Sequence, residues 1–274
     1  MGSPLHMPRN IKLTIAYDGT RYAGWQIQPG KETIQGILTR ILEKILQHKV
    51  TLIGASRTDA GVHALGQVAH FHTESSITGF KLLGALNGLL PEDIAVQAVQ
   101  EVAPQFHARK LAKKKTYRYL ILNSAIRNPL WITRARHAGN PLKIKEMRQG
   151  ARCLVGRHDF RAFQGRKAAT KTSVRTIESI VIGSCRGDPC DRPGADRMGR
   201  IQDSPLRTSK MIGITITGNG FLKQMVRNIV GLLLEVGEGR RSPSDVKKVL
   251  ASRDRTQAGA CAPACGLYLI QVDY

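Results

Sequence analysis

Alternation of apolar and polar residues is the clearest structural signal along this chain of 274 residues. Successive side chains of a β-strand point to opposite faces, so strict alternation predicts a half-buried strand. Residues 11–17 follow this pattern, with an apolar or aromatic side chain at every second position. Shorter or less regular apolar runs predict further strands at residues 50–55, 67–73, 94–100, 115–122, 175–183, 210–217 and 267–274.

Apolar residues spaced by three and four positions predict helices with one buried face. They do so at residues 34–46, 79–90, 144–155 and 221–236. Pro91 ends the second of these, because proline cannot continue a helix. A short helix is expected to begin at Ser242, since Pro243 suits a first turn and Asp245 lies three residues after the cap.

Consecutive strands occur beside strand–helix pairs in this order of elements. Such a mixed order favours an α+β fold, with helices packed on a mainly antiparallel sheet, over a doubly wound parallel sheet. Two halves with similar patterns are expected, at residues 8–105 and 106–274. Residues 1–7 read as an expression leader, and residues 184–209 read as a long loop because they lack periodicity and are rich in glycine, proline, aspartate and arginine.

The chain is strongly basic. It holds 42 lysines and arginines against 20 aspartates and glutamates, for a formal net charge of +22. A polyanionic partner is the simplest explanation, and nucleic acid is the most common one, although a basic surface can also serve solubility alone. No segment has the length of apolar sequence that a membrane span needs, and no export signal is recognisable, so we expect a cytoplasmic protein.

Metal sites are weakly supported. Five cysteines do not form a disulfide framework. Zinc binding by Cys185, Cys190, Cys261 and Cys265 is conceivable, but their spacings are loose for zinc. His63, His70 and His72 could form another metal set with Asp59, yet histidines on strands are more often packed or solvated. We therefore expect no metal.

The stretch SRTDAGVHALGQVAHF places Asp59 in a loop after a short strand. Loops held by a rigid sheet often carry reactive groups, and the small residues beside Asp59 suit close approach of another backbone. Asp59 could cap a helix, pair with Arg57, bind a metal or act as a nucleophile. Spacing alone favours the structural roles.

Two further stretches suggest RNA chemistry. In FHARKLAKKKTYRYLIL, the cations Arg109, Lys113, Lys114 and Lys115 precede a strand that carries Tyr117. Cations can hold phosphates while an aromatic ring stacks on an exposed base, although a solvated turn before a core strand is an equal alternative. Arg227 falls within an apolar helix, where a buried cation needs a negative partner.

Six ordered motifs resemble the tRNA pseudouridine synthase A (TruA) family. They are YDGTRYAGWQIQ, GASRTDAGVHALGQVAHF, FHARKLAKKKTYRYLI, GRHDFRAF, FLKQMVRNIVGLLLEVGEG and APACGLYLIQVDY. The resemblance implies a cofactor-free homodimer that isomerises uridine to pseudouridine in the anticodon stem-loop of tRNA, at positions 38 to 40. It also implies the pseudouridine synthase fold, in which two related α+β halves share a merged sheet with a basic cleft between them.

The same resemblance assigns roles to individual residues. Asp59 corresponds to the nucleophile, Tyr117 to the ring that stacks on the target base and can act as a general base, and Arg227 to the partner of the carboxylate. Arg57 corresponds to the residue that enters the stem and holds the nucleotide out. Attack at C1′, attack at C6 and a glycal route all remain open.

Three alternatives remain at this stage. The chain could be a pseudouridine synthase of the same family with another RNA target, a noncatalytic RNA-binding protein, or a metal-dependent RNA enzyme built on the three histidines. Only the first would retain both the fold and the chemistry.

Overall fold

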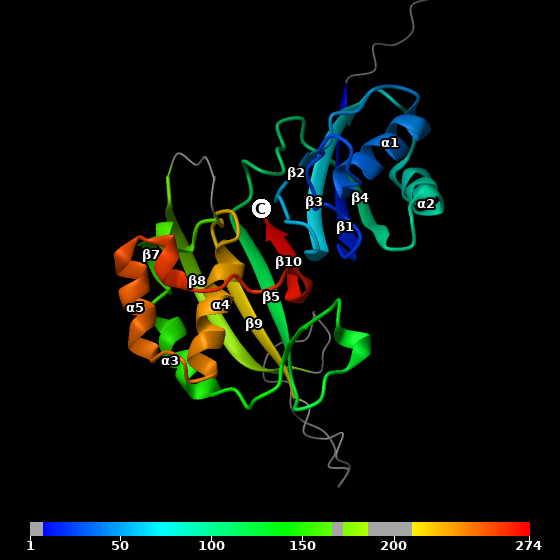
Figure 1. Ribbon diagram of the computed structural model, residues 1–274. Helices are drawn as coiled ribbons and strands as arrows, with labels where there is room; N and C mark the ends of the chain where they lie inside the picture. The colour runs from blue at the N-terminus through cyan, green and yellow to red at the C-terminus, as the bar shows by residue number, and fades with distance from the viewer. Residues whose placement is uncertain (1–7, 166–171, 186–209) are drawn as a thin grey trace, which may run out of the picture. The chain divides into compact units, whose positions relative to one another are not determined.

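The computed structural model describes residues 8–165, 172–185 and 210–274, and its contacts divide the chain into two compact units (Figure 1). Unit 1 comprises Met1–Lys113 and Gln271–Tyr274, and unit 2 comprises Lys114–Ile270. The expected leader lies outside the described residues, as does the expected loop beyond Cys185. The division into halves at residues 105 and 106 stays a prediction.

Unit 1 is an antiparallel sheet covered by two helices. Its elements are β1 (Arg9–Tyr17), α1 (Ile34–Leu46), β2 (Ile53–Gly54), β3 (His63–Thr73), α2 (Gly79–Leu89) and β4 (Ile94–Val102). Strand β1 pairs with β3 on one edge and β4 on the other, and the short β2 pairs antiparallel with β3. Helices α1 and α2 lie together on one side of these strands (Figure 1).

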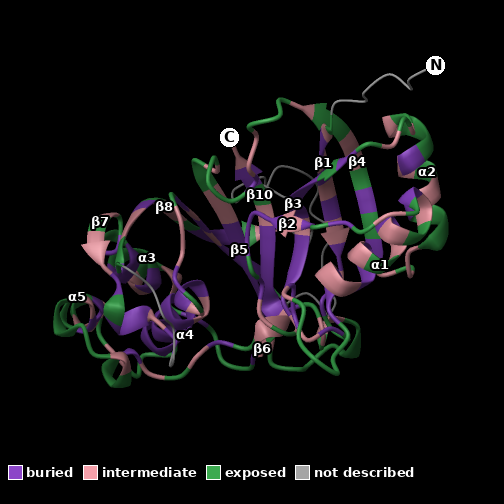
Figure 2. Ribbon diagram, turned by 90° about the horizontal axis from the view of Figure 1, so that it is seen from above, coloured by how far each residue is buried: buried purple, intermediate pink, exposed green. Residues whose placement is uncertain are grey.

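The sequence pattern explains this packing. Ile11, Leu13 and Ile15 are at most 2% exposed, because alternate residues of β1 face the two helices. Helix α1 buries an apolar stripe against the sheet and begins at Thr33, whose side chain accepts a hydrogen bond from the Gly36 N–H. Figure 2 shows the buried residues running along the strands, with exposed turns on α1 and α2.

The C-terminal tail completes unit 1. The Tyr274 hydroxyl donates to the Ala108 carbonyl at 2.9 Å, and its ring lies 4.8 Å from that of Phe106. The Lys113 N–H also donates to the Asp273 carbonyl at 2.8 Å. Residues at the far end of the chain therefore hold the segment that carries Arg109.

In the described residues of unit 2, a mainly antiparallel sheet region is flanked by three α-helices. Its strands are β5 (Lys114–Asn123), β6 (Arg136–Ala138), β7 (Gly156–Asp159), β8 (Val174–Cys185), β9 (Lys210–Gly218) and β10 (Leu267–Asp273), the last of which ends in unit 1. Strands β5, β9, β8 and β7 pair antiparallel in that order, and β6 pairs parallel to β5. Helices α3 (Ile144–Arg152), α4 (Met225–Gly237) and α5 (Pro243–Ser252) pack together beside this sheet (Figure 1).

Helix α4 is the core of unit 2. Almost every residue from Met225 to Gly237 is buried, as expected for a helix that is apolar all round. Its one buried carboxylate, Glu235, pairs with the Arg241 guanidinium at 2.6 Å. At Gly231 an added Cβ would lie 1.9 Å from the Ala260 carbonyl oxygen, so only glycine allows the segment after α5 to pack this closely.

The structure confirms the α+β fold and its mainly antiparallel strands, with differences in detail. The strand expected at residues 50–55 is reduced to Ile53–Gly54. Helix α4 begins at Met225 and not at residue 221, because Gln224 adopts a left-handed conformation with φ 59°. Within the described ranges, every helix is too short or too polar to span a lipid bilayer.

Candidate active site

Asp59 lies in the loop that joins β2 to β3 in unit 1. A turn at Ala60 and Gly61 follows it, in which the Val62 N–H donates to the Asp59 carbonyl at 3.2 Å. Gly61 has φ +75°, a conformation that other residues adopt only with strain. The glycine beside Asp59 is therefore required by the turn itself, independently of any ligand.

Hydrogen bonds of buried residues fix the backbone of this loop. The Thr58 and Tyr17 hydroxyls lie 2.9 Å apart, and the Trp25 N–H donates to the Thr58 carbonyl at 3.1 Å. Gln67 binds the Ser56 backbone twice, accepting from its N–H and donating to its carbonyl. Tyr17, Trp25 and Gln67 are all at least 95% buried, so the backbone around Asp59 is held by rigid groups.

Two charged side chains of the loop are accessible to solvent, to different extents. Ser56 and Thr58 are buried, whereas Arg57 is exposed and Asp59 is half-buried. Arg57 and Asp59 are therefore the accessible residues of the stretch 56–59, and their roles in binding and chemistry stay predictions.

Arg109 is a second guanidinium that interacts electrostatically with Arg57 in unit 1. Burial lowers the pKa of Arg109 below its usual value, and the positive charge of Arg57 lowers it further. The Arg109 backbone is fixed by a hydrogen bond from its N–H to His107 Nδ1 at 3.2 Å. Two cations that act on each other favour a shared anionic ligand, which would offset their repulsion.

In unit 2, Tyr117 lies on β5 and is 7% exposed. Its ring meets that of Phe221 edge to face, with centroids 5.1 Å apart and an interplanar angle of 82°. Tyr119, two residues on, packs on the same side of the strand and donates to the Pro263 carbonyl at 2.9 Å. The packing fixes the plane of the Tyr117 ring.

Arg227 occupies the first turn of α4, because the helix starts later than the sequence pattern indicates. Its Nε donates to the Ala262 carbonyl at 2.7 Å, and its own carbonyl accepts from the Ala262 N–H at 3.1 Å. A cation near a helix N-terminus is unfavourable with respect to the helix dipole. The position is therefore one that a negative partner would stabilise.

The three lysines of the basic stretch have different surroundings. Lys114 forms an ion pair at 2.7 Å with the carboxylate of Glu178, which lies on β8. Lys113 is exposed, and Lys115 lies opposite Gly218 in the pairing of β5 with β9. A ligand that used Lys114 would therefore compete with Glu178.

The histidines have partners that account for their positions. His63 Nδ1 accepts from the Gly19 N–H at 3.2 Å, and His70 Nδ1 accepts from the Ala108 N–H at 3.2 Å. The His70 ring is 2% exposed and lies 4.9 Å from that of His107. Among the described residues, no group of three or more His, Cys, Asp or Glu side chains could hold a metal ion; Cys190 lies outside them.

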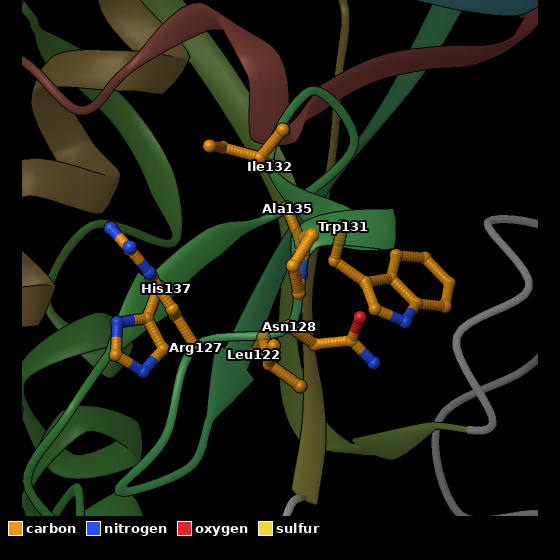
Figure 3. A pocket seen from close by; sticks show the side chains of 8 residues that line it. Leu122, Arg127, Asn128, Trp131, Ile132, Ala135 and His137 are labelled. Atoms are coloured by element: carbon orange, nitrogen blue, oxygen red, sulfur yellow. The ribbon is translucent and has the colours of Figure 1, made fainter.

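A hollow of about 230 Å³ on unit 2 contains none of the expected site residues (Figure 3). Leu122, Trp131, Ile132 and Ala135 give it a largely apolar lining, with Arg127 and His137 at one side. It belongs to the segment between β5 and β6, which covers buried Leu120 and Leu122. Its lining offers no carboxylate for the expected chemistry.

Sequence reasoning did not identify Tyr17, Trp25 and Gln67 as supports of the Asp59 loop. Tyr17 and Trp25 belong to the motif YDGTRYAGWQIQ, and aromatic residues so close to a turn-rich stretch were the available signal. Gln67 was detectable only as a polar residue inside an apolar strand. Such a residue needs a buried hydrogen-bond partner, here the Ser56 backbone.

Comparisons with known proteins identify the family of the chain. A family profile described as tRNA pseudouridine synthase matches residues 13–109 and 151–274, which include Asp59 and Arg227 but not Tyr117. The chain is 42% identical over 266 residues to tRNA pseudouridine synthase A of Ruminiclostridium cellulolyticum, covering 97% of this chain and 100% of that protein.

Two other relatives carry the same name. The protein from Acetivibrio thermocellus is 44% identical over 97% of this chain and 100% of its own length. The one from Myxococcus xanthus is 42% identical over 98% of this chain and 92% of its own length. Similarity at this level over nearly the whole chain shows that it belongs to the tRNA pseudouridine synthase family, whose members are isomerases.

Proposed function

We propose that this chain converts uridine to pseudouridine in the anticodon stem-loop of tRNA, at positions 38 to 40, with Asp59 as nucleophile. The observation that carries the proposal is a half-buried carboxylate, two residues after the exposed Arg57, on a loop whose backbone is fixed by buried groups. Such a loop can keep a reactive group in place while a large substrate binds.

The target nucleotide has to leave the base stack before any of this chemistry can begin. Its C1′ and C5 atoms are inaccessible inside a stem, and extrusion costs a few kcal/mol. Arg57 is suited to occupy the vacated place, because it is exposed and lies two residues before Asp59. Arg57 and Arg109 together attract the negatively charged backbone.

The reaction is an isomerisation and needs no external reagent. The bond between C1′ and N1 breaks, the base turns, and a bond between C1′ and C5 forms. The C5 proton leaves to solvent, and N1 gains a proton. Asp59 begins this sequence by attack at C1′ or C6 or by removing the C2′ proton, so its carboxylate has to be ionised.

Tyr117 and Arg227 take supporting roles in this proposal. The Tyr117 ring, held by Phe221, stacks on the detached base so that it does not escape, and its hydroxyl is the candidate base for the C5 proton. The Arg227 guanidinium, anchored on Ala262, favours the ionised form of the catalytic carboxylate. We further propose that the active form is a homodimer.

Replacement of the carboxylate tests this function. Asp59→Asn keeps the size and polarity of the side chain but removes the nucleophile, so pseudouridine formation should be abolished while tRNA binding is retained. The measurement is tritium release from C5-labelled uridine in tRNA, beside a binding titration. Normal turnover in this variant would end the assignment of Asp59, and tRNA affinity without turnover in the unaltered protein would leave only a noncatalytic RNA-binding protein.

The target site requires a separate experiment. Pseudouridine should be mapped in tRNA from cells with and without the protein, and positions 38 to 40 should lose the modification when the protein is absent. Loss at other positions would show that the chain has a different RNA target within the same chemistry.

A further inference from the structure

A polar cavity lies beside the first turn of α4, entirely within unit 2. Its volume is about 550 Å³, which is within the range of ligand sites. It is lined by Lys223, Gln224, Arg255, Thr256, Gly259 and Ala260, together with the Cys261 thiol. None of these residues belongs to the proposed catalytic set.

Arg255 is a rigid cation in this cavity. Its two Nη atoms donate to the Gly259 carbonyl at 2.8 Å and to the Asn228 side-chain oxygen at 2.9 Å. Asn228 is fully buried and is itself fixed by donating to the Phe163 carbonyl at 2.8 Å. Both acceptors of Arg255 are neutral, so within the described residues these bonds orient its guanidinium without neutralising its charge.

Lys223 contributes a second positive charge. Its carbonyl accepts from the Gly165 N–H at 2.8 Å, and the next residue, Gln224, has the left-handed conformation that starts α4. The backbone is therefore fixed, while the Lys223 side chain is exposed at the cavity. A flexible ammonium beside a rigid guanidinium is a common arrangement for binding phosphate.

The nearby carboxylates are already bound to other groups. Asp254 accepts from the Thr256 N–H at 2.9 Å and from its hydroxyl at 2.7 Å. Glu235 lies behind Gly259 and Ala260, where it pairs with Arg241 at 2.6 Å and with Arg240 at 3.7 Å. Neither Asp254 nor Glu235 lines the cavity, so the charged groups at its surface are the cations of Lys223 and Arg255.

The lining also indicates which part of a nucleic acid would fit. It contains no aromatic side chain among the described residues, so it offers no surface on which a base could stack. We propose that this cavity binds a backbone phosphate of the RNA substrate, an inference that rests on the proposed function. Since Cys261 precedes Ala262, the anchor of Arg227, the phosphate would lie next to a residue of the catalytic set.

A charge-removing variant tests the site in the full-length protein. Lys223→Gln should weaken binding of an unmodified tRNA transcript about 3-fold to 10-fold at low salt. It should also lower the slope of log Kd against log salt by about one, the change expected for one lost phosphate contact. The matched control is Lys247→Gln, which removes an exposed lysine of α5 that does not line the cavity.

The Cys261 thiol provides a second readout that does not depend on turnover. Bound tRNA should slow its alkylation in the unaltered protein, with a Cys261→Ser variant identifying the modified site. If Lys223→Gln and Lys247→Gln have the same Kd and salt slope, the phosphate site is wrong. If inorganic phosphate at matched ionic strength protects Cys261 but Lys223→Gln leaves the tRNA slope unchanged, the cavity takes free phosphate and the RNA assignment is overturned.

These outcomes separate the cavity from the proposed function. A Lys223-dependent slope in a protein that forms no pseudouridine would support the phosphate site and remove the proposed activity. Pseudouridine formation in a protein whose salt slope does not depend on Lys223 would support the proposed activity and remove the phosphate site.

Discussion

The orientation of Asp59 depends on buried residues that would not contact a ligand. The hydrogen bond between the Tyr17 and Thr58 hydroxyls and the bond from Trp25 to Thr58 both act on the residue directly before Asp59. A reactive group placed on such a backbone is oriented before the substrate arrives, and small displacements of a reactive group can reduce rates greatly. The rigidity of this loop is therefore part of the proposed catalysis.

A substitution at Tyr117 can separate the contribution of the aromatic ring from that of the hydroxyl. Tyr117→Phe retains the edge-to-face contact with Phe221 and removes only the phenol. If the phenol is the general base, the rate of pseudouridine formation should fall by about 100-fold or more, with little change in tRNA binding. Single-turnover kinetics give this rate directly. An unchanged rate would limit Tyr117 to stacking.

His70 should make the stability of unit 1 depend on pH. Burial, followed by the charges of His107 and His72, lowers the pKa of His70 to about 4, whereas an unfolded histidine titrates near 6.5. Between these values the unfolded chain binds more protons than the folded one. The free energy of unfolding is therefore not reduced by His70 above pH 6.5. It should decrease by about 2–3 kcal/mol as the pH falls toward 4.

A substitution isolates this contribution. His70→Asn retains an acceptor for the Ala108 N–H but cannot take up a proton in this range, so its stability should depend less on pH. Urea denaturation at intervals between pH 7.5 and 4.5 provides the comparison. His158, which is half-buried in unit 2, supplies the control variant His158→Asn. Equal pH dependence in wild type and His70→Asn would contradict the assignment.

Residue-scale prediction from sequence succeeds where the information is local. Arg57 and Asp59 lie on a loop between strands, as their flanking residues indicate. The ion pair of Lys114 with Glu178 could not be foreseen, because it depends on which strands of unit 2 become neighbours. The roles of Asp59, Tyr117 and Arg227 stay predictions until the variants are measured.

At the scale of elements, α4 and the segment after α5 form one packed structure. Gly231 lies against Ala260 on this contact, and an alanine Cβ would approach a backbone oxygen that cannot move aside cheaply. We expect Gly231→Ala to lower the free energy of unfolding by about 1–3 kcal/mol, measured by urea denaturation.

Gly84 is the matched control for this substitution. It lies within helix α2, it is exposed, and an added Cβ would meet no atom within 4 Å. Gly84→Ala should stabilise the protein by about 0.5–1 kcal/mol, since alanine is the better helix former. Destabilisation of similar size in both variants would show that the contact with Ala260 does not restrict position 231.

The elements themselves differ in how far their patterns predict them. Strand β9 reads KMIGITITG, and its three isoleucines are at most 3% exposed, so the alternation alone indicates a strand with one buried face. The start of α4 carries no comparable signal, because the left-handed conformation of Gln224 arises from its surroundings. Strands β6 and β7 are too short to show a period.

At the scale of the whole molecule, the net charge of +22 dominates the interaction with any polyanion. A field of this size accelerates association with RNA and holds phosphates without reading sequence. Recognition of a particular uridine therefore has to come from shape and from contacts to the base, while affinity comes mainly from charge.

The binding of tRNA should consequently weaken steeply with salt. Each phosphate that a lysine or arginine neutralises releases counterions, so contact with six or more phosphates lowers affinity by about 1000-fold between 50 and 200 mM salt. The Asp59→Asn variant suits this titration, because it should bind tRNA without converting it during the measurement. A nearly flat profile would mean that stacking and hydrogen bonds, and not the basic surface, provide the affinity.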